Sequence, residues 1–331
     1  MPITIKDIAE SLNLSVSTVS KALNGYSDVS EATRRLVREA QLELGYHPSA
    51  AARNLRLKQG NRIGIVLPFK GMRSDAILSM VEGIGKAAKE LAVKVLFYTS
   101  IDDDMEMLEQ ICRSRDVNGL LISGQSQTFD LGQAVNFLRQ EALPFVVFGH
   151  QFEGAAIATV AAHYHRGVSQ AVNYLLDAGH QRIAYISRVG DDGNNQEKFG
   201  AYTQSLKQRG QTLCPELVVN AAYESFAGVK AMQQLLALDT PPDAVLCFND
   251  HVAMDAIFHA QSVGFRIPQD IAVIGCDNIT HGQLMQPKLS TIEVPLFDIG
   301  YAAMRHLFDL MGEGEHGQIV FETEFLRRES A

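Results

Sequence analysis

The first 45 residues carry short apolar faces that recur with the period of an α-helix. Four apolar residues at i, i+3, i+4 and i+7 predict a first helix: Ile5, Ile8, Ala9 and Leu12. Ser15 can cap a second helix, which Asn24-Gly25 can end and whose inward residues are expected to be Val19, Ala22 and Leu23. A third helix, Ser30 to Gly45, is expected to bury Thr33, Leu36, Val37, Ala40 and Leu44. Because helices this short are marginal alone, the three should share one small core.

From Arg62 onward, short apolar runs alternate with amphipathic stretches. The runs predict buried strands at 63–67, 93–98, 119–122, 145–148, 183–186, 244–248 and 271–275. Strands that alternate with helices are typical of an α/β fold with parallel sheets. The alternation pauses near Thr159-Val160 and resumes near His163, which indicates two lobes of similar size with a cleft between them. Ligands of such sheets bind at the carboxyl ends of the strands.

Charge is distributed unevenly along the 331 residues, a length that predicts two or three packed units. The formal net charge of the chain is -9. Residues 1–60 hold eight Lys or Arg against six Asp or Glu, whereas the remainder holds 21 against 32. Only the N-terminal part can therefore approach a phosphate backbone without strong repulsion.

The cysteines and the apolar stretches exclude several classes of protein. Cys112, Cys214, Cys247 and Cys276 lie far apart, and no C-x-x-C pair suggests a zinc or redox site, so neither a metal nor a cofactor is expected. The beginning of the chain lacks the continuous apolar core of a secretory signal. No stretch reaches the roughly 18 apolar residues of a membrane span. We expect a soluble, cytoplasmic protein.

The first two helices have the pattern of a helix-turn-helix, whose second helix enters the major groove of DNA. Periodicity alone also fits a plain helical bundle. The residue strings favour a DNA-binding domain, because they resemble the headpiece of the lactose-repressor family, LacI/GalR. The matching strings are Ile5-Lys6-Asp7-Ile8-Ala9, Ser15-Val16-Ser17-Thr18-Val19-Ser20-Lys21-Ala22-Leu23-Asn24, Val29-Ser30-x-x-Thr33-Arg34 and Leu44-Gly45-Tyr46-x-Pro48-Ser49-x-x-Ala52-Arg53-x-Leu55.

This resemblance implies roles for residues of the second helix. Val16, Ser17 and Lys21 become the principal base-reading side chains, and a lysine suits the guanine acceptors of the major groove. Thr18, Ser20 and Asn24 would contact phosphates. Alternatively, Thr18 and Ser20 are simply exposed polar residues of a helix.

Residues 48–58 are rich in alanine and basic, and are too short for a helix that persists alone in water. In the family, the matching segment is a hinge helix that forms on the operator and inserts a leucine into the minor groove, a wedge that bends DNA. The resemblance assigns this wedge to Leu55 and adds Arg53 and Arg56 as DNA-binding residues. A plain flexible linker is the alternative.

The resemblance extends more loosely over the rest of the chain. Its matching strings are Gly179-His180-x-x-Ile183-Ala184, Asn249-Asp250-x-x-Ala253, Ile267-Pro268-x-Asp270-Ile271-x-Val273-Ile274-Gly275-x-Asp277-Asn278 and Pro287-x-Leu289-Ser290-Thr291-Ile292. It implies the two-lobed fold of periplasmic sugar-binding proteins, in which the chain crosses between the lobes three times. Residues from about 293 to 325 should then return to the first lobe.

Three effector-binding candidates transfer from the family's pocket. Asp277 and Asn249 follow expected strands, where a carboxylate or an amide can bind ligand hydroxyls. Asp277 could instead cap backbone amides of its own loop. Tyr223 matches an aromatic stacking position, although a surface tyrosine fits equally well.

Other candidates depart from the family's pattern. Lys198 stands where the family has an arginine. The ammonium group of a lysine is a point charge and binds a carboxylate less well than the planar guanidinium group of an arginine, so a neutral polyol or sugar fits more easily. His150 stands where Asp or Arg is frequent and is either a ligand-binding or a loop histidine. Ala161-Ala162-His163 replaces the usual Asp-Asn. Arg73, Ser74 and Asp75 follow the first strand in a loop that commonly lines the cleft.

The expected organisation has three parts. Residues 1–46 form the DNA-binding headpiece, 47–60 the hinge, and 61–331 the effector-binding and dimerisation domain. In the last part, the N-lobe comprises about 61–160 and 293–325, and the C-lobe about 161–292. A homodimer would place two headpieces on the half-sites of a near-palindromic operator. The chain ends without a leucine heptad, which favours a dimer over a tetramer.

The expected function is that of a transcription regulator, in the family most often a repressor, whose operator affinity changes when a small molecule binds. A solute-binding protein without DNA-dependent regulation is the alternative. An enzyme is not expected, because the chain has no P-loop, dinucleotide turn or G-x-S-x-G motif. The identity of the effector, and whether it releases or recruits DNA binding, stay open.

Overall fold

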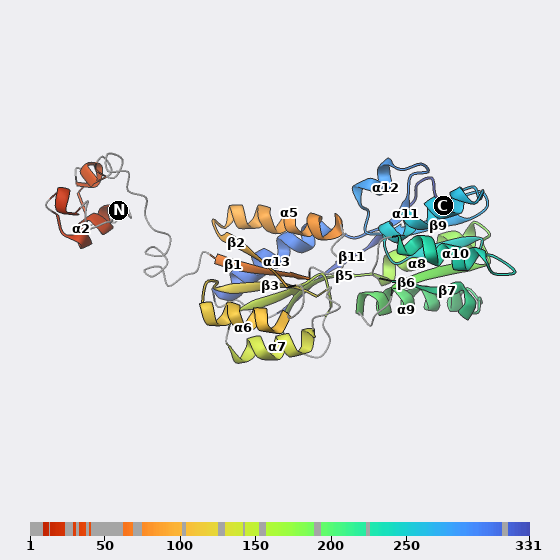
Figure 1. The fold of residues 1–331 in the computed structure, drawn as a ribbon, viewed down its shortest axis with the longest axis horizontal. Coiled ribbons are helices and arrows are strands. Elements are labelled where there is room, and N and C mark those ends of the chain that lie inside the picture. Colours follow the sequence, from red (N-terminus) through yellow and green to blue (C-terminus); the bar gives the residue numbers. More distant parts are fainter. Residues whose placement is uncertain are drawn as a thin grey trace. The chain divides into compact units, whose positions relative to one another are not determined.

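The computed structural model describes residues 9–12, 14–23, 29–30, 33–37, 40, 62–68, 75–100, 104–124, 130–141, 143–151, 157–188, 193–222, 226–312 and 317–331. Contacts divide the chain into an N-terminal unit, Met1–Gly60, and a C-terminal unit, Asn61–Ala331. Each unit has its own hydrophobic core (Figure 1).

The N-terminal unit contains helix α2, Val16–Leu23. The Ser15 hydroxyl accepts a hydrogen bond from the backbone N–H of Thr18 at 3.0 Å, which confirms the predicted cap. Ser30 accepts in the same way from Thr33 at 3.2 Å. The unit's core comprises Ala9, Val19, Ala22, Val29, Val37 and Ala40. One expectation is wrong: Leu36 is exposed, because it lies about 100° around the helix from the buried Val37.

The C-terminal unit contains two six-stranded sheets. In the first lobe, the strand order is β11-β5-β4-β3-β1-β2, and every neighbouring pair is parallel. Its strands are β1 (Arg62–Pro68), β2 (Lys94–Ser100), β3 (Gly119–Ser123), β4 (Phe145–Phe148), β5 (Ala158–His163) and β11 (Gln318–Glu322). Its helices are α5 (Asp75–Glu90), α6 (Asp104–Ser114), α7 (Leu131–Gln140) and α13 (Leu296–Met311).

In the second lobe, the strand order is β12-β10-β9-β8-β6-β7, and only the edge strand β12 runs antiparallel to its neighbour. Its strands are β6 (Ile183–Arg188), β7 (Val218–Ala221), β8 (Ala244–Cys247), β9 (Ala272–Cys276), β10 (Ser290–Glu293) and β12 (Glu324–Leu326). Its helices are α8 (His165–Asp177), α9 (Gly193–Gln208), α10 (Ala227–Leu236), α11 (Asp250–Ser262) and α12 (Thr280–Leu284), with a short 3-10 turn at Pro215–Leu217.

Helices cover both faces of each sheet, which explains why the strands are almost continuously apolar. In the first lobe, α5 and α13 pack on one face, and α6 and α7 on the other (Figure 1). In the second lobe, α8 and α9 pack on one face, and α10 and α11 on the other. The predicted α/β class with parallel sheets is therefore confirmed.

The chain passes between the lobes three times, after β5, after β10 and after β11. The returning segment differs slightly from the expectation of about 293–325: β11 ends at Glu322 in the first sheet, whereas β12 already belongs to the second. The expected pause near Thr159-Val160 is wrong. These residues belong to β5, whose alanine-rich sequence lacks the run of large apolar residues that marks the other strands.

Candidate functional site

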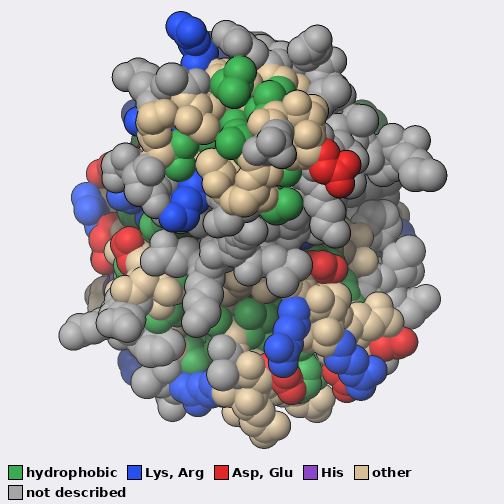
Figure 2. Space-filling view, turned by 90° about the vertical axis from the view of Figure 1, so that its left-hand side faces the viewer, with side chains coloured by type: hydrophobic (Ala, Val, Ile, Leu, Met, Phe, Trp, Pro, Cys, Tyr) green, Lys and Arg blue, Asp and Glu red, His purple; other side chains and the backbone are tan. Residues whose placement is uncertain are grey.

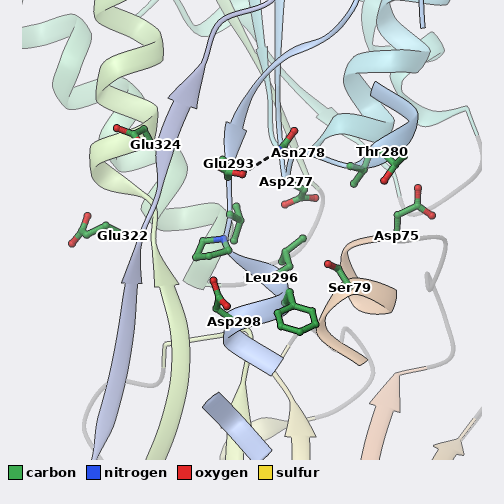
Figure 3. A pocket seen from close by; sticks show the side chains of 14 residues that line it. Asp75, Ser79, Asp277, Asn278, Thr280, Glu293, Leu296, Asp298, Glu322 and Glu324 are labelled. Carbon is green, nitrogen blue, oxygen red and sulfur yellow. Dashed lines mark hydrogen bonds between the residues drawn. The ribbon is translucent and has the colours of Figure 1, made fainter. Parts of the chain in front are cut away.

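A cavity of about 470 Å³ lies between the lobes of the C-terminal unit. Side chains from the start of α5, the loop after β9, the second crossing and the ends of β11 and β12 line it (Figure 3). Its lining includes six carboxylates: Asp75, Asp277, Glu293, Asp298, Glu322 and Glu324. None of the described residues that line it is Lys, Arg or His. The side chains that line the cavity therefore offer a ligand mainly oxygen acceptors.

Hydrogen bonds and ion pairs hold several of these carboxylates. Glu293 accepts a hydrogen bond from the Asn278 amide at 2.9 Å, drawn as a dashed line in Figure 3. Glu322 lies 3.3 Å from Nδ1 of His163. Glu324 lies 3.2 Å from Arg166. These partners fix the side chains around the cavity without contributing a positive charge to its lining.

Asp277 lies directly after β9, at the carboxyl end of the second sheet, and its side chain lines the cavity (Figure 3). Its φ of 119° is unusual for a residue with a Cβ, and such strained backbone is concentrated at functional sites. Burial raises the pKa of Asp277 to about 7, and the Lys198 ammonium opposes this rise. The site thus has a carboxyl group whose charge changes near neutral pH.

A second buried carboxylate, Asp250, supports the loop that carries Asp277. Asp250 is only 1% exposed; it accepts hydrogen bonds from the Thr291 hydroxyl at 2.6 Å and from the backbone N–H of Ile279 at 2.8 Å. Burial raises its pKa to about 6. Asp250 therefore connects α11, the loop after β9 and β10.

Of the other described candidates from the sequence, Asp75 lines the cavity, whereas Asn249, Lys198 and His150 are not among its lining residues. The side chain of Asn249 accepts a hydrogen bond from the N–H of Val252 at 3.0 Å and so caps α11. Lys198 is 7% exposed and donates a hydrogen bond to the carbonyl of Phe248 at 2.8 Å. His150 follows β4 in the first lobe and packs against Gly193 in the second, where a Cβ would lie 2.9 Å from the imidazole. Asp75, the first residue of α5, lines the cavity.

Two further polar contacts join the lobes beside the cleft. The Asn194 amide donates a hydrogen bond to the Gly149 carbonyl at 2.7 Å. Nδ1 of His281, on α12, lies 2.6 Å from the Asp75 carboxylate. The lobes are therefore in contact around the cavity.

Some candidates lie outside the described residues: Arg73, Ser74, Tyr223, Asn24, Arg53, Leu55 and Arg56. Ser17 and Ser20 belong to α2. On the same helix, Lys21 is exposed, whereas Val16 is partly buried against the small core, which leaves it less free to point outward than expected. The Thr18 hydroxyl contacts that of Ser15 at 2.8 Å. The DNA-reading roles of these residues remain predictions.

On the face drawn in Figure 2, the described Lys and Arg side chains are interspersed with Asp and Glu, and hydrophobic side chains show only in small groups. None of the helices in the described segments combines the length and the apolar composition that a bilayer crossing needs. Within those segments, no group of three His, Cys, Asp or Glu is placed to hold a metal ion.

Sequence reasoning did not identify Ser79, Glu293, Asp298 and Glu322 as residues of the site. Glu293 comes directly after the string Leu289-Ser290-Thr291-Ile292, so a search beyond that string could have found it. Glu322 carried no such signal, because it ends β11, which joins the first sheet only after the chain has crossed back from the second lobe.

Two family models match the chain. The model of bacterial regulatory proteins of the lacI family matches residues 4–49, and the model of the periplasmic binding protein-like domain matches residues 172–331.

Curated relatives align with almost the whole chain. The HTH-type transcriptional repressor CytR of Escherichia coli (strain K12) is 31% identical and covers 99% of this chain and 96% of its own length. The probable HTH-type transcriptional repressor ExuR of Bacillus subtilis (strain 168) is 30% identical and covers 99% of this chain and 98% of its own length.

Solved structures show the same fold. A complex of the transcriptional regulator CelR with cellobiose has a TM-score of 0.75, is 26% identical, and covers 99% of this chain and all of its own. A lac repressor dimer bound to operator and the anti-inducer ONPF has a TM-score of 0.88, is 24% identical, and covers 100% of this chain and 99% of its own.

Proposed function

Because the chain belongs to the LacI family of DNA-binding transcriptional repressors, which are not enzymes, we propose that a neutral, polyhydroxylated small molecule in the interlobe cavity controls its repression. Operator DNA and a small-molecule effector are the two partners of this family of repressors. The proposal concerns which effector this chain takes and which residues hold each partner.

The acidic lining of the cavity carries the proposal. Six carboxylates and no basic side chain among the described lining residues would repel a phosphate or a carboxylate. The same oxygens accept hydrogen bonds from hydroxyl groups, the recognition chemistry that a sugar or another polyol needs. Asp277 is the central ligand-binding residue and Asp75 lines the same cavity, whereas Asn249 caps α11 and His150 packs against Gly193. CelR, a similar protein, is known in complex with cellobiose.

On the DNA side, we infer that two copies bind a near-palindromic operator as a homodimer in the cytoplasm, where operator DNA is found. A dimer bound to operator is the form described for the lac repressor, which shares the fold. Lys21, Val16 and Ser17 read bases, and Thr18, Ser20 and Asn24 contact phosphates. Residues 47–60 act as a hinge, with Leu55 in the minor groove and Arg53 and Arg56 beside it. The effector releases the operator.

A thermal-shift screen of paired sugars tests the ligand class. D-glucose and cellobiose are compared with D-glucuronate and glucose 6-phosphate, which add one anionic group to a similar ring. A ligand at 100 times its dissociation constant adds about 2.7 kcal/mol to stability, so binding is visible as a higher Tm. We expect a neutral sugar to raise the Tm and its anionic counterpart to leave it unchanged. A rise with the anion alone would contradict the proposal.

A further inference from the structure

The last residues of the chain are bonded to the second sheet, and Arg328 extends from there to a residue of the cavity. Ser330 is fully buried; its hydroxyl donates a hydrogen bond to the Val273 carbonyl at 2.6 Å and accepts one from the Ser290 N–H at 2.8 Å. The Arg328 guanidinium donates from Nη1 to the Leu289 carbonyl at 2.7 Å. Both the backbone beside Arg328 and its guanidinium group are therefore fixed.

Asn278 connects this arginine to a carboxylate of the cavity. Asn278 and Glu293 both line the cavity, whereas Arg328 is not among its lining residues (Figure 3). Nη2 of Arg328 donates a hydrogen bond to Oδ1 of Asn278 at 2.6 Å. Nδ2 of Asn278 donates in turn to Oε1 of Glu293 at 2.9 Å. The three side chains thus form one hydrogen-bonded chain that ends at the cavity.

The partners of the Asn278 amide determine which way it faces. An asparagine amide has an acceptor oxygen and a donor nitrogen, and its hydrogen-bond partners show which is which. Arginine offers donors only, and the Gln283 amide also donates to Oδ1, at 3.4 Å, so the oxygen faces Arg328. A carboxylate only accepts, so the nitrogen faces Glu293. A reversed amide would place oxygen against oxygen at Glu293 and N–H against N–H at Arg328.

The backbone of Asn278 is held independently of its side chain. Its φ of 57° lies in the left-handed region, which asparagine adopts more readily than most residues with a Cβ. Its N–H donates to the Thr291 hydroxyl at 3.3 Å, and this hydroxyl donates to Asp250 at 2.6 Å. Loss of the Arg328 guanidinium should therefore release the amide without displacing the loop.

We propose that Arg328 is a positioning residue, which holds the Asn278 amide with its N–H groups toward Glu293 and thereby orients the Glu293 carboxylate as an acceptor for a ligand hydroxyl. Asn278 bonds to Oε1 of Glu293, so Oε2 is the oxygen that accepts from the ligand. Because Arg328 does not line the cavity, it orients the carboxylate without adding a positive charge to the lining. This inference rests on the proposed function only in taking the cavity as the effector site.

Nitrogen-15 NMR of ligand-free protein labelled at asparagine tests the inference, with Asn278→Ala used to assign the side-chain amide. A hydrogen bond to a carboxylate is short and strong, so it displaces the signal of the donating proton, and Glu293→Ala gives the signal without that acceptor. In Arg328→Met, the amide protons should move at least halfway toward their positions in Glu293→Ala. Arg328→Lys retains a cationic donor and should move them less. Arg327 is exposed and lies over the Tyr174 ring, so Arg327→Met is the control and should leave them unchanged.

Unchanged amide signals in folded Arg328→Met would overturn the inference. If that variant does not fold, labelling of the arginine side chains decides. One guanidinium signal should then shift in Asn278→Ala, because this variant removes the acceptor oxygen, and the inference is overturned if none shifts. Neither NMR measurement contains a ligand.

Calorimetry with the sugar that raises the Tm measures the effect on the effector. Its affinity should fall about 10-fold in Arg328→Met and stay unchanged in Arg327→Met. Equal losses in the two variants, or none in Arg328→Met, would overturn the orienting role. A sugar screen without any ligand counts against the proposed function alone, whereas unresponsive NMR signals count against this inference alone.

Discussion

The N-terminal and C-terminal units hold their specificity in different ways. In the N-terminal unit, the proposed recognition depends on a few side chains of one short helix, α2, which begins after a capping serine and packs its apolar face on the small core. In the C-terminal unit, the proposed recognition depends on carboxylates that segments far apart in the chain bring together around one cavity. Duplex DNA presents a constant shape, so one helix suffices to read it. A small ligand has no constant shape, so its site is specified by packing.

Asp277→Ala should separate ligand response from DNA binding most completely. A buried carboxylate that accepts two hydrogen bonds from a sugar contributes about 3 kcal/mol, so affinity for the bound sugar should fall roughly 100-fold. Operator affinity without sugar should stay unchanged. Isothermal titration calorimetry and DNA binding measure the two quantities. Asp270→Ala, a partly exposed carboxylate that is paired with Arg266 and does not line the cavity, is the control. A variant that still responds fully to the sugar would refute the site.

Lys21→Ala should have the opposite effect, because it should weaken operator binding and leave sugar binding unchanged. Loss of a base-reading lysine should cost about 1 to 3 kcal/mol at the cognate operator and relax the preference for one base pair. Sugar affinity should be unaffected, because Lys21 belongs to the other unit. Fluorescence anisotropy with a set of single-base operator variants measures both the affinity and the preference. If selectivity were unchanged, Lys21 would not read a base.

The buried carboxylates predict how stability depends on pH. The folded pKa values of Asp250 and Asp277 are raised to about 6 and about 7, above their values in an unfolded chain. Their contribution is therefore complete below about pH 4 and is lost as the pH rises through these folded values. Because one pKa unit corresponds to about 1.4 kcal/mol and both folded pKa values lie well above the ordinary 3.8, the free energy of unfolding should fall by several kcal/mol.

Urea unfolding between about pH 4 and about pH 7 measures this fall. Asp250→Asn should flatten the profile, because it removes one of the two titrating groups. Asp270→Asn is the matched control: the pKa of Asp270 is lowered to about 2 by its hydrogen bonds with Arg266, so its contribution is lost only under more acidic conditions. An equally steep profile in Asp250→Asn would contradict the account.

The smallest effect is expected at the contact between Asp75 and His281. Both side chains are partly exposed, so solvent screens their interaction, and removing it should cost about 0 to 1 kcal/mol. His281→Gln should therefore weaken sugar binding by a few-fold at most, through a less stable closed cleft. Asp75→Asn should do the same, and the double variant should add little. Additive losses would show that the two residues act independently.

The sequence predicts those features best that depend on contacts between residues close together in the chain. The cap at Ser15, the buried faces of Val19 and Ala22, and the apolar strands are local features, and the structure confirms them. The strand β5 was missed, because alanine and threonine do not form a distinct apolar run. Leu36 was misassigned, because a short helix leaves the edge of its apolar face uncertain.

The cavity depends on contacts that a linear pattern does not contain. Asp277 was recognisable from its position after a strand, and Glu293 was within reach of the same reasoning. Asp298 and Glu322 reach the cavity only because the chain crosses back to the first lobe after β10. The inward contacts of Lys198 likewise result from packing against Tyr164 and Phe248, which are 34 and 50 residues away in sequence.

The central claim is that the N-terminal unit binds operator DNA and that a ligand in the cavity of the C-terminal unit weakens this binding. It is tested most directly by fluorescence anisotropy of labelled promoter fragments at low salt, where phosphate contacts are strongest. We expect tight binding without ligand, and loss of binding on addition of the sugar that raises the Tm. Promoter DNA that stays unbound, both without and with every sugar of the screen, would contradict it.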